Sequence, residues 1–425
     1  MPNRVVITGM GVVAPNGVGL APFLEAIRTG RSGITHHPLL AQLEFSCQIA
    51  GTPLLSDEFI ANYFSEIELR NFNSSGIMYG VIAAMDAWRD AGLQIASSEE
   101  PDWDSGTIFG TGTSGVDKFR EAIYKIDDLQ TRRLGSNVVS QTMASGISAY
   151  IGGKLGLGNQ VSSNSSACTT GTESILMAYE RIKSGLATRI LAGSTSDSGP
   201  YIWAGFDAMK VCTFKHNDSP ESGSRPMSAS ASGFVPGAGA GAFVLESLES
   251  ALARGARIYA EILGGELNSG GQRGSGSMTA PNAMAVQRCI RNAVQHAGIH
   301  ASEIDLINGH LTATSKDSLE IQNWAAALQR SGDDFPYINS LKSMVGHCLS
   351  AAGSVECVAA LLQMQQGFIA PNINCEDLNP EITSIISASS IPRIQRSHPV
   401  QILAKASFGF GDVNSCIIFK KHISA

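Results

Sequence analysis

The strongest constraint on the fold is a pattern that occurs twice along the chain. Short apolar strands alternate with helical stretches, and a glycine-rich strand closes each run, first at residues 239–245 and again at residues 409–418. A fresh strand begins at residues 258–264. Alternating strands and helices are typical of α/β folds, and a repeated order indicates two copies of one architecture. We therefore predict two related α/β halves, residues 1–255 and residues 256–425.

Composition and charge exclude several classes of protein. The 425 residues are 43% hydrophobic and 16% charged, a balance that can bury a large core and argues against disorder. The net charge of -7 argues against nucleic acid and anionic membranes as partners. The N-terminus lacks a signal-peptide pattern, and no apolar run is long enough to span a bilayer. We predict a cytoplasmic protein that binds neither membrane nor nucleic acid.

The sequence also gives no sign of a metal or a nucleotide cofactor. The eight cysteines include no Cys-x-x-Cys pair, and the nine histidines form no His-Glu-x-x-His motif. The glycine turn at residues 110–112 lacks the spacing and the downstream acidic residue of a dinucleotide-binding fold. We predict reduced thiols, no metal and no nucleotide.

One cysteine stands out by its position. Cys168 lies among small and hydroxylated residues, and a helical pattern that begins directly after it runs to a C-cap at Gly185. This pattern places the thiol at the positive end of a helix dipole, where a lowered pKa would favour the thiolate. A buried, inert thiol is the alternative, and the stretch alone leaves both interpretations open.

The second half adds two histidines and a lysine at the ends of predicted elements. A strand at residues 304–310 ends in His310, and the stretch from residue 338 onward delivers Lys342 and His347. The helix that follows His347 is apolar on all sides, as a buried helix is. Each histidine alone is compatible with a structural role. Together with Cys168 they indicate a Cys/His/His catalytic site.

Four motifs that occur in this order carry a resemblance to a known family. They are Ser-Ala-Cys-Thr-Thr-Gly at 166–171, His-Leu-Thr-Ala-Thr at 310–314, Lys-Ser-Met-Val-Gly-His at 342–347 and Ser-Phe-Gly-Phe-Gly at 407–411. Over nearly the whole chain the sequence resembles the elongating β-ketoacyl-acyl-carrier-protein synthases. The resemblance implies the thiolase fold, in which two αβαβα halves form a five-layer core and two chains usually form a dimer.

The resemblance also implies a reaction, the decarboxylative Claisen condensation of malonyl-acyl-carrier-protein with an acyl chain. Cys168 would hold the acyl chain as a thioester. His310 and His347 would stabilise the enolate that decarboxylation releases, because donors must face the oxygen on which negative charge develops. Lys342 would support the histidines and pair with Glu320.

Further roles follow from the same resemblance. Backbone N–H groups of Cys168 and Phe408 would form an oxyanion hole, and the Phe408 side chain would act as a gate. Thr312 and Thr314 would bind the phosphopantetheine arm of an acyl carrier protein. The substrates would arrive on that arm, so the enzyme would need no cofactor of its own.

The chain departs from the family pattern around these parts. Leu311 and Ala313 stand where the family usually has glycine, and Asp412 follows the gating motif in place of another glycine. Residues 66–70 are less basic than the segment that usually docks the carrier protein, and the cations at 132, 133, 210 and 215 are candidates to compensate. The catalytic motifs are therefore intact, while the substrate surroundings differ.

Three other interpretations remain open. The chain could be the ketosynthase subunit of a specialised type II polyketide or polyene pathway and pair with a chain-length-factor homologue instead of with itself. A thiolase would need a second cysteine in the C-terminal glycine loop, where this chain has Asp412. A non-catalytic scaffold would lack the nucleophile, so the presence of Cys168 argues against it.

Overall fold

The computed structural model describes residues 2–97 and 99–422. Its main feature is an eleven-stranded sheet in which each half of the chain supplies its own block of strands. The N-terminal block consists of β1 (Val5–Ala14), β2 (Gly17–Val18), β5 (Ser105–Thr111), β6 (Val161–Ser162), β7 (Arg189–Ser196) and β8 (Gly239–Ser247). The C-terminal block consists of β9 (Ala260–Ser269), β10 (Leu306–Asn308), β11 (Tyr337–Asn339), β14 (Ile402–Gly409) and β15 (Val413–Lys421).

The two blocks have the same topology. From the outer edge inward, the strand order is β6-β5-β7-β8-β1 in one block and β11-β10-β14-β15-β9 in the other. In each block the two outer pairings are parallel and the two inner ones antiparallel. Strands β1 and β9 join the blocks through a short antiparallel pairing. The prediction of two related halves in a thiolase-like fold is confirmed, and the exact boundary at residue 255 stays a prediction.

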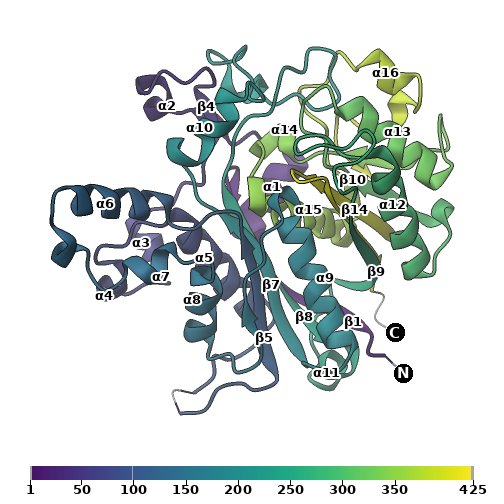
Figure 1. The fold of residues 1–425 in the computed structure, drawn as a ribbon. Coiled ribbons are helices and arrows are strands. Elements are labelled where there is room, and N and C mark those ends of the chain that lie inside the picture. The colour runs from purple at the N-terminus through teal and green to yellow at the C-terminus, as the bar shows by residue number, and fades with distance from the viewer. Residues whose placement is uncertain (1, 98, 423–425) are drawn as a thin grey trace.

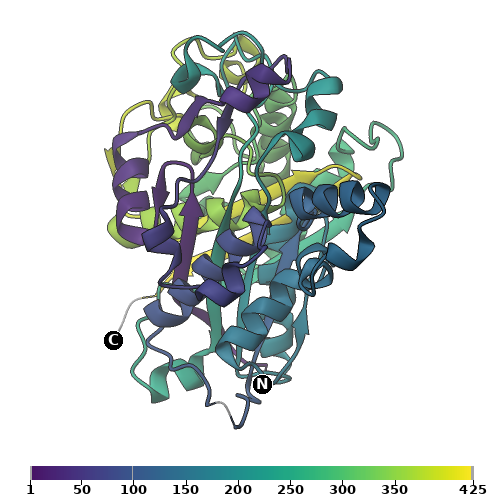
Figure 2. The ribbon, with the colours of Figure 1, turned by 90° about the vertical axis from the view of Figure 1, so that its left-hand side faces the viewer.

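Helices cover and separate the two blocks in layers (Figure 1). Helices α5 (Ser75–Asp90) and α8 (Gly146–Leu155) pack on the outer face of the N-terminal strands, the side that faces the viewer in Figure 2. Helices α12 (Ala283–Ala297) and α13 (Asp317–Leu328) form the opposite outer layer, on the side of the C-terminal strands. Helices α9 (Thr170–Lys183) and α15 (Ala352–Gln366) lie between the blocks and contact strands of both.

The central helix α15 is apolar on all sides because other elements surround it. Its residues from Ala352 to Met364 are buried, and the apolar ones join one hydrophobic cluster with residues of α9 and of both strand blocks. Separate clusters fill the spaces under α5 and α8 and under α12 and α13. Among the described residues, no helix combines the length and the apolar character that crossing a bilayer requires.

Shorter elements connect these layers. Several of them lie within residues 31–75, where elements of three to five residues are too short to show a clear period in the sequence. The connecting elements are α1 (Leu20–Thr29), α2 (Pro38–Gln42), α3 (Asp57–Ile60), α4 (Glu66–Leu69), α6 (Val116–Asp127), α7 (Val138–Thr142), α10 (Pro200–Ala208), α11 (Leu248–Ala253), α14 (Lys342–Val345), α16 (Pro380–Thr383), β3 (Ile34–His36), β4 (Ile49–Gly51), β12 (Phe368–Ile369) and β13 (Arg396–Ser397).

The N-termini of α9 and α15 meet at the centre of the molecule. A Cβ atom on Gly171 would lie 2.4 Å from the backbone nitrogen of Ser354, and one on Gly353 would lie 2.6 Å from the hydroxyl of Thr172. Both helices follow a short 3-10 turn, η2 (Ala167–Thr169) or η5 (Leu349–Ala351), whose first residue has a φ of 50°. The close approach fixes Cys168, in the first of these turns, at the centre of the fold.

We predict that Gly171→Ala destabilises the protein. The added methyl group has no space between the two central helices, and overpacking of this kind lowers the free energy of unfolding by about 1–3 kcal/mol. Gly153→Ala in α8 is the matched control, because no atom lies within 4 Å of its Cβ position. Denaturant unfolding of both variants checks this, and equal stability of Gly171→Ala and the wild type would contradict the packing described above.

Candidate active site

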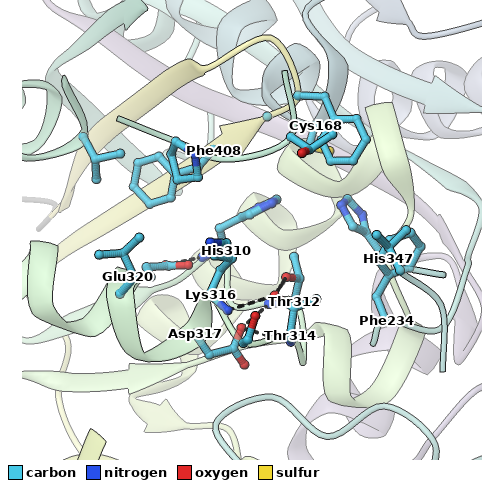
Figure 3. Close-up of a pocket in the computed structure, with 18 of the residues that line it drawn as sticks. Cys168, Phe234, His310, Thr312, Thr314, Lys316, Asp317, Glu320, His347 and Phe408 are labelled. Atoms are coloured by element: carbon cyan, nitrogen blue, oxygen red, sulfur yellow. Dashed lines mark hydrogen bonds between the residues drawn. The ribbon is translucent and has the colours of Figure 1, made fainter. Parts of the chain in front are cut away.

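The structure brings Cys168, His310 and His347 together in one cavity (Figure 3). One potential metal-ligating atom of each residue, the Sγ of the cysteine and a ring nitrogen of each histidine, lies within 4.8 Å of the other two. The residues come from three places: the turn before α9, the loop after β10 and the loop after α14. Because the turn and the loops all reach the middle of the molecule, residues up to 179 positions apart in sequence become neighbours.

The cavity measures about 360 Å³ and has both apolar and polar walls. Thr312 and Thr314 lie on its polar side, and their hydroxyl groups are 3.0 Å apart. The aromatic residues that line it are Phe206, Phe234, Phe408 and Phe410. A cavity of this kind suits a flexible ligand that carries an apolar chain and a few hydrogen-bonding groups.

The tautomer of His347 is set by a backbone donor. The N–H of Leu349 donates to Nδ1 of the ring at 3.0 Å. Burial, together with the Lys342 and Lys405 ammonium groups, holds the pKa of His347 well below its usual value of 6.5, so the ring is neutral. A neutral ring that accepts at Nδ1 carries its proton on Nε2. His347 therefore presents an N–H donor.

Lys342 sets the tautomer of His310 in the same way. Its Nζ lies 3.4 Å from Nδ1 of His310 and also donates to the backbone carbonyl of that residue. Burial, the Lys342 ammonium and the two further basic groups His347 and Lys405 hold the pKa of His310 well below 6.5. The second ring is thus also neutral and also keeps its proton on Nε2.

The carboxylate that pairs with Lys342 is Glu356, and the predicted pairing with Glu320 is wrong. Lys342 Nζ donates to Glu356 Oε1, and both side chains are almost completely buried. Glu320 instead accepts the backbone N–H groups of His310 and Leu311, each at 2.7 Å. The sequence could not reveal that Glu356 takes the place of Glu320 as the partner of Lys342. Glu356 lies on helix α15, where the apolar pattern gave no reason to expect an ion pair.

Two carboxylates in the first turn of α13 hold the loop at residues 310–314. Asp317 accepts the backbone N–H groups of residues 312, 313 and 314, and Glu320 accepts those of the two residues before them. Burial raises the pKa of Asp317 to about 6 and that of Glu320 to about 7, against the effect of these donors. Leu311 and Ala313 adopt φ angles of 23° and 61°. The two carboxylates thus maintain a backbone shape that favours glycine.

Cys168 is the one cysteine of the eight that is not fully buried, as a nucleophile requires. Burial of its sulfur nevertheless raises its pKa to about 11, although the Lys342 ammonium and the backbone N–H of Phe410 lower it. The sequence prediction of a lowered pKa is therefore wrong, because loss of water around the sulfur outweighs the helix terminus. The thiol is therefore protonated at neutral pH.

The backbone donor next to the sulfur belongs to Phe410. The N–H of Phe410 and that of Cys168 itself both face Sγ. The prediction from the sequence assigned this donor to Phe408, whose ring instead contacts the ring of His310 at a centroid distance of 6.2 Å. The Ser-Phe-Gly-Phe-Gly motif contains two phenylalanines in alternate positions, and its spacing alone does not reveal which backbone N–H faces the cysteine.

Asp412, the other departure from the family pattern, joins two loops at the edge of the cavity. Its carboxylate accepts the backbone N–H groups of Gln272 and Asn282, at 3.0 Å and 2.8 Å, and its carbonyl oxygen accepts that of Gly270. The side chain is 1% exposed, and φ is 60°. Residues 270–282, which include the cavity-lining Thr279 and Pro281, are thereby fixed to the loop that carries Phe410.

The Cys/His/His group does not fit a metal ion. A histidine that binds a metal through Nε2 keeps its proton on Nδ1 and donates it to an acceptor. Here the Nδ1 atoms of both rings face donors, the N–H of Leu349 and the ammonium group of Lys342. Among the described residues this is the one group of three potential ligands that lie close enough to hold an ion.

Comparison with known proteins identifies sequence relatives over the full length of the chain. Two family profiles match, "Beta-ketoacyl synthase, N-terminal domain" over residues 2–251 and "Beta-ketoacyl synthase, C-terminal domain" over residues 259–376. A curated relative, 3-oxoacyl-[acyl-carrier-protein] synthase 1 of Haemophilus influenzae, is 32% identical over 426 residues and covers 99% of each chain.

Solved structures of polyketide enzymes are similar over the whole chain as well. A ketosynthase bound to a hexaketide and in complex with its type II polyketide acyl-carrier protein superposes with a TM-score of 0.86 and is 28% identical. The ishigamide ketosynthase/chain length factor gives a TM-score of 0.87 and is 27% identical. Both comparisons cover 100% of each chain.

We predict that Asp412→Ala loosens the loop at residues 270–282. The substitution removes the acceptor for two backbone N–H groups, and loss of such buried hydrogen bonds typically costs about 1–3 kcal/mol. Hydrogen exchange of the Gln272 and Asn282 amides should become faster, whereas amides of α5 on the far side of the sheet should keep their protection. Unchanged exchange at residues 270–282 would show that the carboxylate does not hold this loop.

Proposed function

The chain belongs to the β-ketoacyl synthase family, and on this premise we propose that it elongates an acyl chain by decarboxylative Claisen condensation with malonyl-acyl-carrier-protein. One observation carries the proposal: the one cysteine that is not fully buried shares a cavity with two neutral imidazoles that each keep an Nε2–H donor. A nucleophile for an acyl group and two donors for a developing oxyanion are the parts that this reaction needs.

The first step transfers the acyl group to Cys168. Sγ attacks the thioester carbonyl of the incoming acyl chain, the bond between that carbonyl and the pantetheine sulfur breaks, and the thiol proton leaves with the departing sulfur. The exchange is neutral overall, so a raised thiol pKa does not prevent it. The Lys342 ammonium and the Phe410 backbone N–H stabilise the negative charge that passes through Sγ.

The second step is decarboxylation of the malonyl thioester. Its carbonyl oxygen accepts hydrogen bonds from the Nε2–H groups of His310 and His347. The bond to the malonyl carboxylate breaks, CO2 departs and the electron pair forms an enolate on that oxygen. Neutral donors suit this step, because they stabilise the enolate without transferring a proton that would quench its carbon. Burial and the nearby ammonium groups keep both rings neutral.

The third step joins the two chains. The enolate carbon attacks the acyl carbonyl on Cys168, and the backbone N–H groups of Cys168 and Phe410 stabilise the oxyanion. The C–S bond then breaks, the β-ketoacyl chain remains on the carrier, and the Cys168 thiolate takes up a proton from the bulk solvent. The negative charge thus passes from the malonyl carboxylate to the enolate and finally to the sulfur, and it is neutralised there.

We propose an acyl carrier protein as the partner and no cofactor held by the enzyme itself. The phosphopantetheine arm would enter along Thr312 and Thr314, whose hydroxyl groups line the cavity. Lys316 lines the same cavity and is exposed, and Lys210 follows the lining residue Met209 on the surface. These two ammonium groups would attract an acidic carrier. For Arg132 and Arg133, which are exposed after α6, a docking role stays a prediction.

We also propose a homodimer that forms through the β6 edge and helix α6. Strand β6 is the last strand in the order of the sheet, and Val161 in it is 40% exposed. Helix α6 exposes Phe119 (56%) and Tyr124 (53%), and Leu129 just beyond it is 93% exposed. An exposed strand edge and exposed apolar side chains are both typical of interaction surfaces.

Sedimentation of the purified chain tests the dimer. We expect about twice the chain mass of 44.7 kDa, and Phe119→Asp should lower it by placing charge in the interface. Met284→Asp is the control, because Met284 is 72% exposed but belongs to α12, in the opposite outer layer. A monomeric mass of the chain alone would contradict the homodimer, and recovery of a dimer with a chain-length-factor homologue would support the heterodimer.

A specialised polyketide or polyene pathway is the second candidate. The similarity to polyketide ketosynthases over 100% of the chain supports it, as do Leu311, Ala313 and Asp412 beside the cavity. Both candidates use the same reaction, and they differ in the acyl chains accepted. Product analysis with malonyl carrier protein and primers of different length and saturation distinguishes them.

We predict that acyl-carrier-protein thioester acylates the Cys168 peptide and no other cysteine peptide. Cys168→Ala should abolish condensation, because the other cysteines are buried. Cys375→Ala, which removes a buried thiol of the outer C-terminal cluster, should still be acylated. Mass spectrometry of digested protein makes the measurement. An acyl group on another residue, or condensation by Cys168→Ala, would overturn the proposed function.

A further inference from the structure

A second lysine, Lys405, lies inside the molecule close to the site. It belongs to β14, is 0% exposed and is one of three charged side chains that form a buried cluster. Its Nζ lies 2.8 Å from Oε2 of Glu356, whose other oxygen pairs with Lys342. Lys342 in turn contacts Nδ1 of His310. A continuous chain of contacts thus leads from Lys405 to the imidazole that faces the substrate.

The cluster has more positive than negative charge. Two ammonium groups share a single carboxylate, so the formal charge of the cluster is +1, and the three side chains are at most 2% exposed. Lys405 donates to the backbone carbonyl of Ala406 and to the hydroxyl of Ser407, and its contact with Glu356 is an ion pair without hydrogen-bond geometry. Burying an ammonium group is unfavourable. One carboxylate can balance only one ammonium group, so the second lysine does not stabilise the fold by balancing charge.

We propose that Lys405 is an electrostatic positioning residue for the decarboxylation step. Lys405 and Lys342 both pair with the single carboxylate of Glu356. The cluster therefore keeps an excess positive charge on the side of the two histidines that faces away from the cavity. This charge favours the enolate, which is the negative species formed in front of them. The inference rests on the proposed function, since it concerns the enolate of that reaction.

The excess charge also keeps the imidazoles in the state that the reaction needs. Burial and the ammonium groups of Lys342 and Lys405 lower the pKa of both His310 and His347. Protonation of His310 would place an Nδ1–H against the Lys342 ammonium and break their contact. The other titratable groups around the rings and around the lysines are Cys168, Asp317, Glu320, Cys348, Cys357 and Cys416.

The experiment compares two half-reactions of the full-length enzyme. Lys405→Met removes the charge and keeps an unbranched side chain. With malonyl-loaded acyl carrier protein and no primer, CO2 release should fall at least about tenfold. Acyl transfer to Cys168 should change by less than about threefold, because the excess charge faces the enolate site. Lys118→Met is the control, since it also removes a buried lysine, one that pairs with Glu121 away from the cavity.

Two further measurements distinguish the effect of the lost charge from that of a structural defect. In Lys405→Met the imidazole pKa values rise, so the acidic limb of the CO2-release profile should move to higher pH. Adding Glu356→Gln to Lys405→Met restores a cluster charge of +1 through Lys342, and CO2 release should partly recover. Lys405→Gln and its double variant with Glu356→Gln provide the same comparison if the methionine variant does not fold.

The outcomes distinguish this inference from the function on which it rests. Absence of CO2 release by the wild-type enzyme would overturn the proposed function. Wild-type release together with unchanged release by the Lys405 variants would overturn the role of Lys405 alone. So would an equal loss in both half-reactions that Glu356→Gln does not reverse, because a structural defect does not respond to cluster charge.

Discussion

The architecture depends on the close contact between the N-termini of α9 and α15. Gly171 and Gly353 let the two helices meet where any side chain would collide with the neighbouring backbone or hydroxyl group. The turn before one helix carries Cys168, and the loop before the other carries His347. The same arrangement that builds the fold from two similar blocks therefore also builds the site, with Cys168 from one half and the histidines from the other.

Burial has opposite effects on the pKa values of the thiol and of the imidazoles, and the proposed mechanism uses both effects. It raises the pKa of the Cys168 thiol and lowers the pKa of both imidazoles, because it disfavours the charged form of each. The free site thus contains a neutral thiol and two neutral rings in front of a positive cluster. In the proposed reaction, negative charge arrives only with the malonyl substrate and is stabilised by donors that are already oriented.

Much of this could be read from the sequence, and the failures have physical causes. The repeated strand pattern gave the two halves, and the ordered motifs identified Cys168, His310 and His347. The pKa of the thiol could not be predicted, because it depends on desolvation by side chains distant in sequence. The same is true of the Lys342–Glu356 pair, which links two elements through tertiary packing. Phe410 was missed because the orientation of a backbone N–H depends on strand register.

The central claim is that both histidines are neutral rings with the proton on Nε2. Nitrogen NMR of the histidine side chains in the free enzyme measures this directly, because protonated and unprotonated ring nitrogens resonate at distinct positions. At neutral pH we expect His310 and His347 to show an unprotonated Nδ1 and a protonated Nε2, with His310→Gln and His347→Gln variants to assign the signals. An imidazolium at either position, or a proton on either Nδ1, would contradict the account.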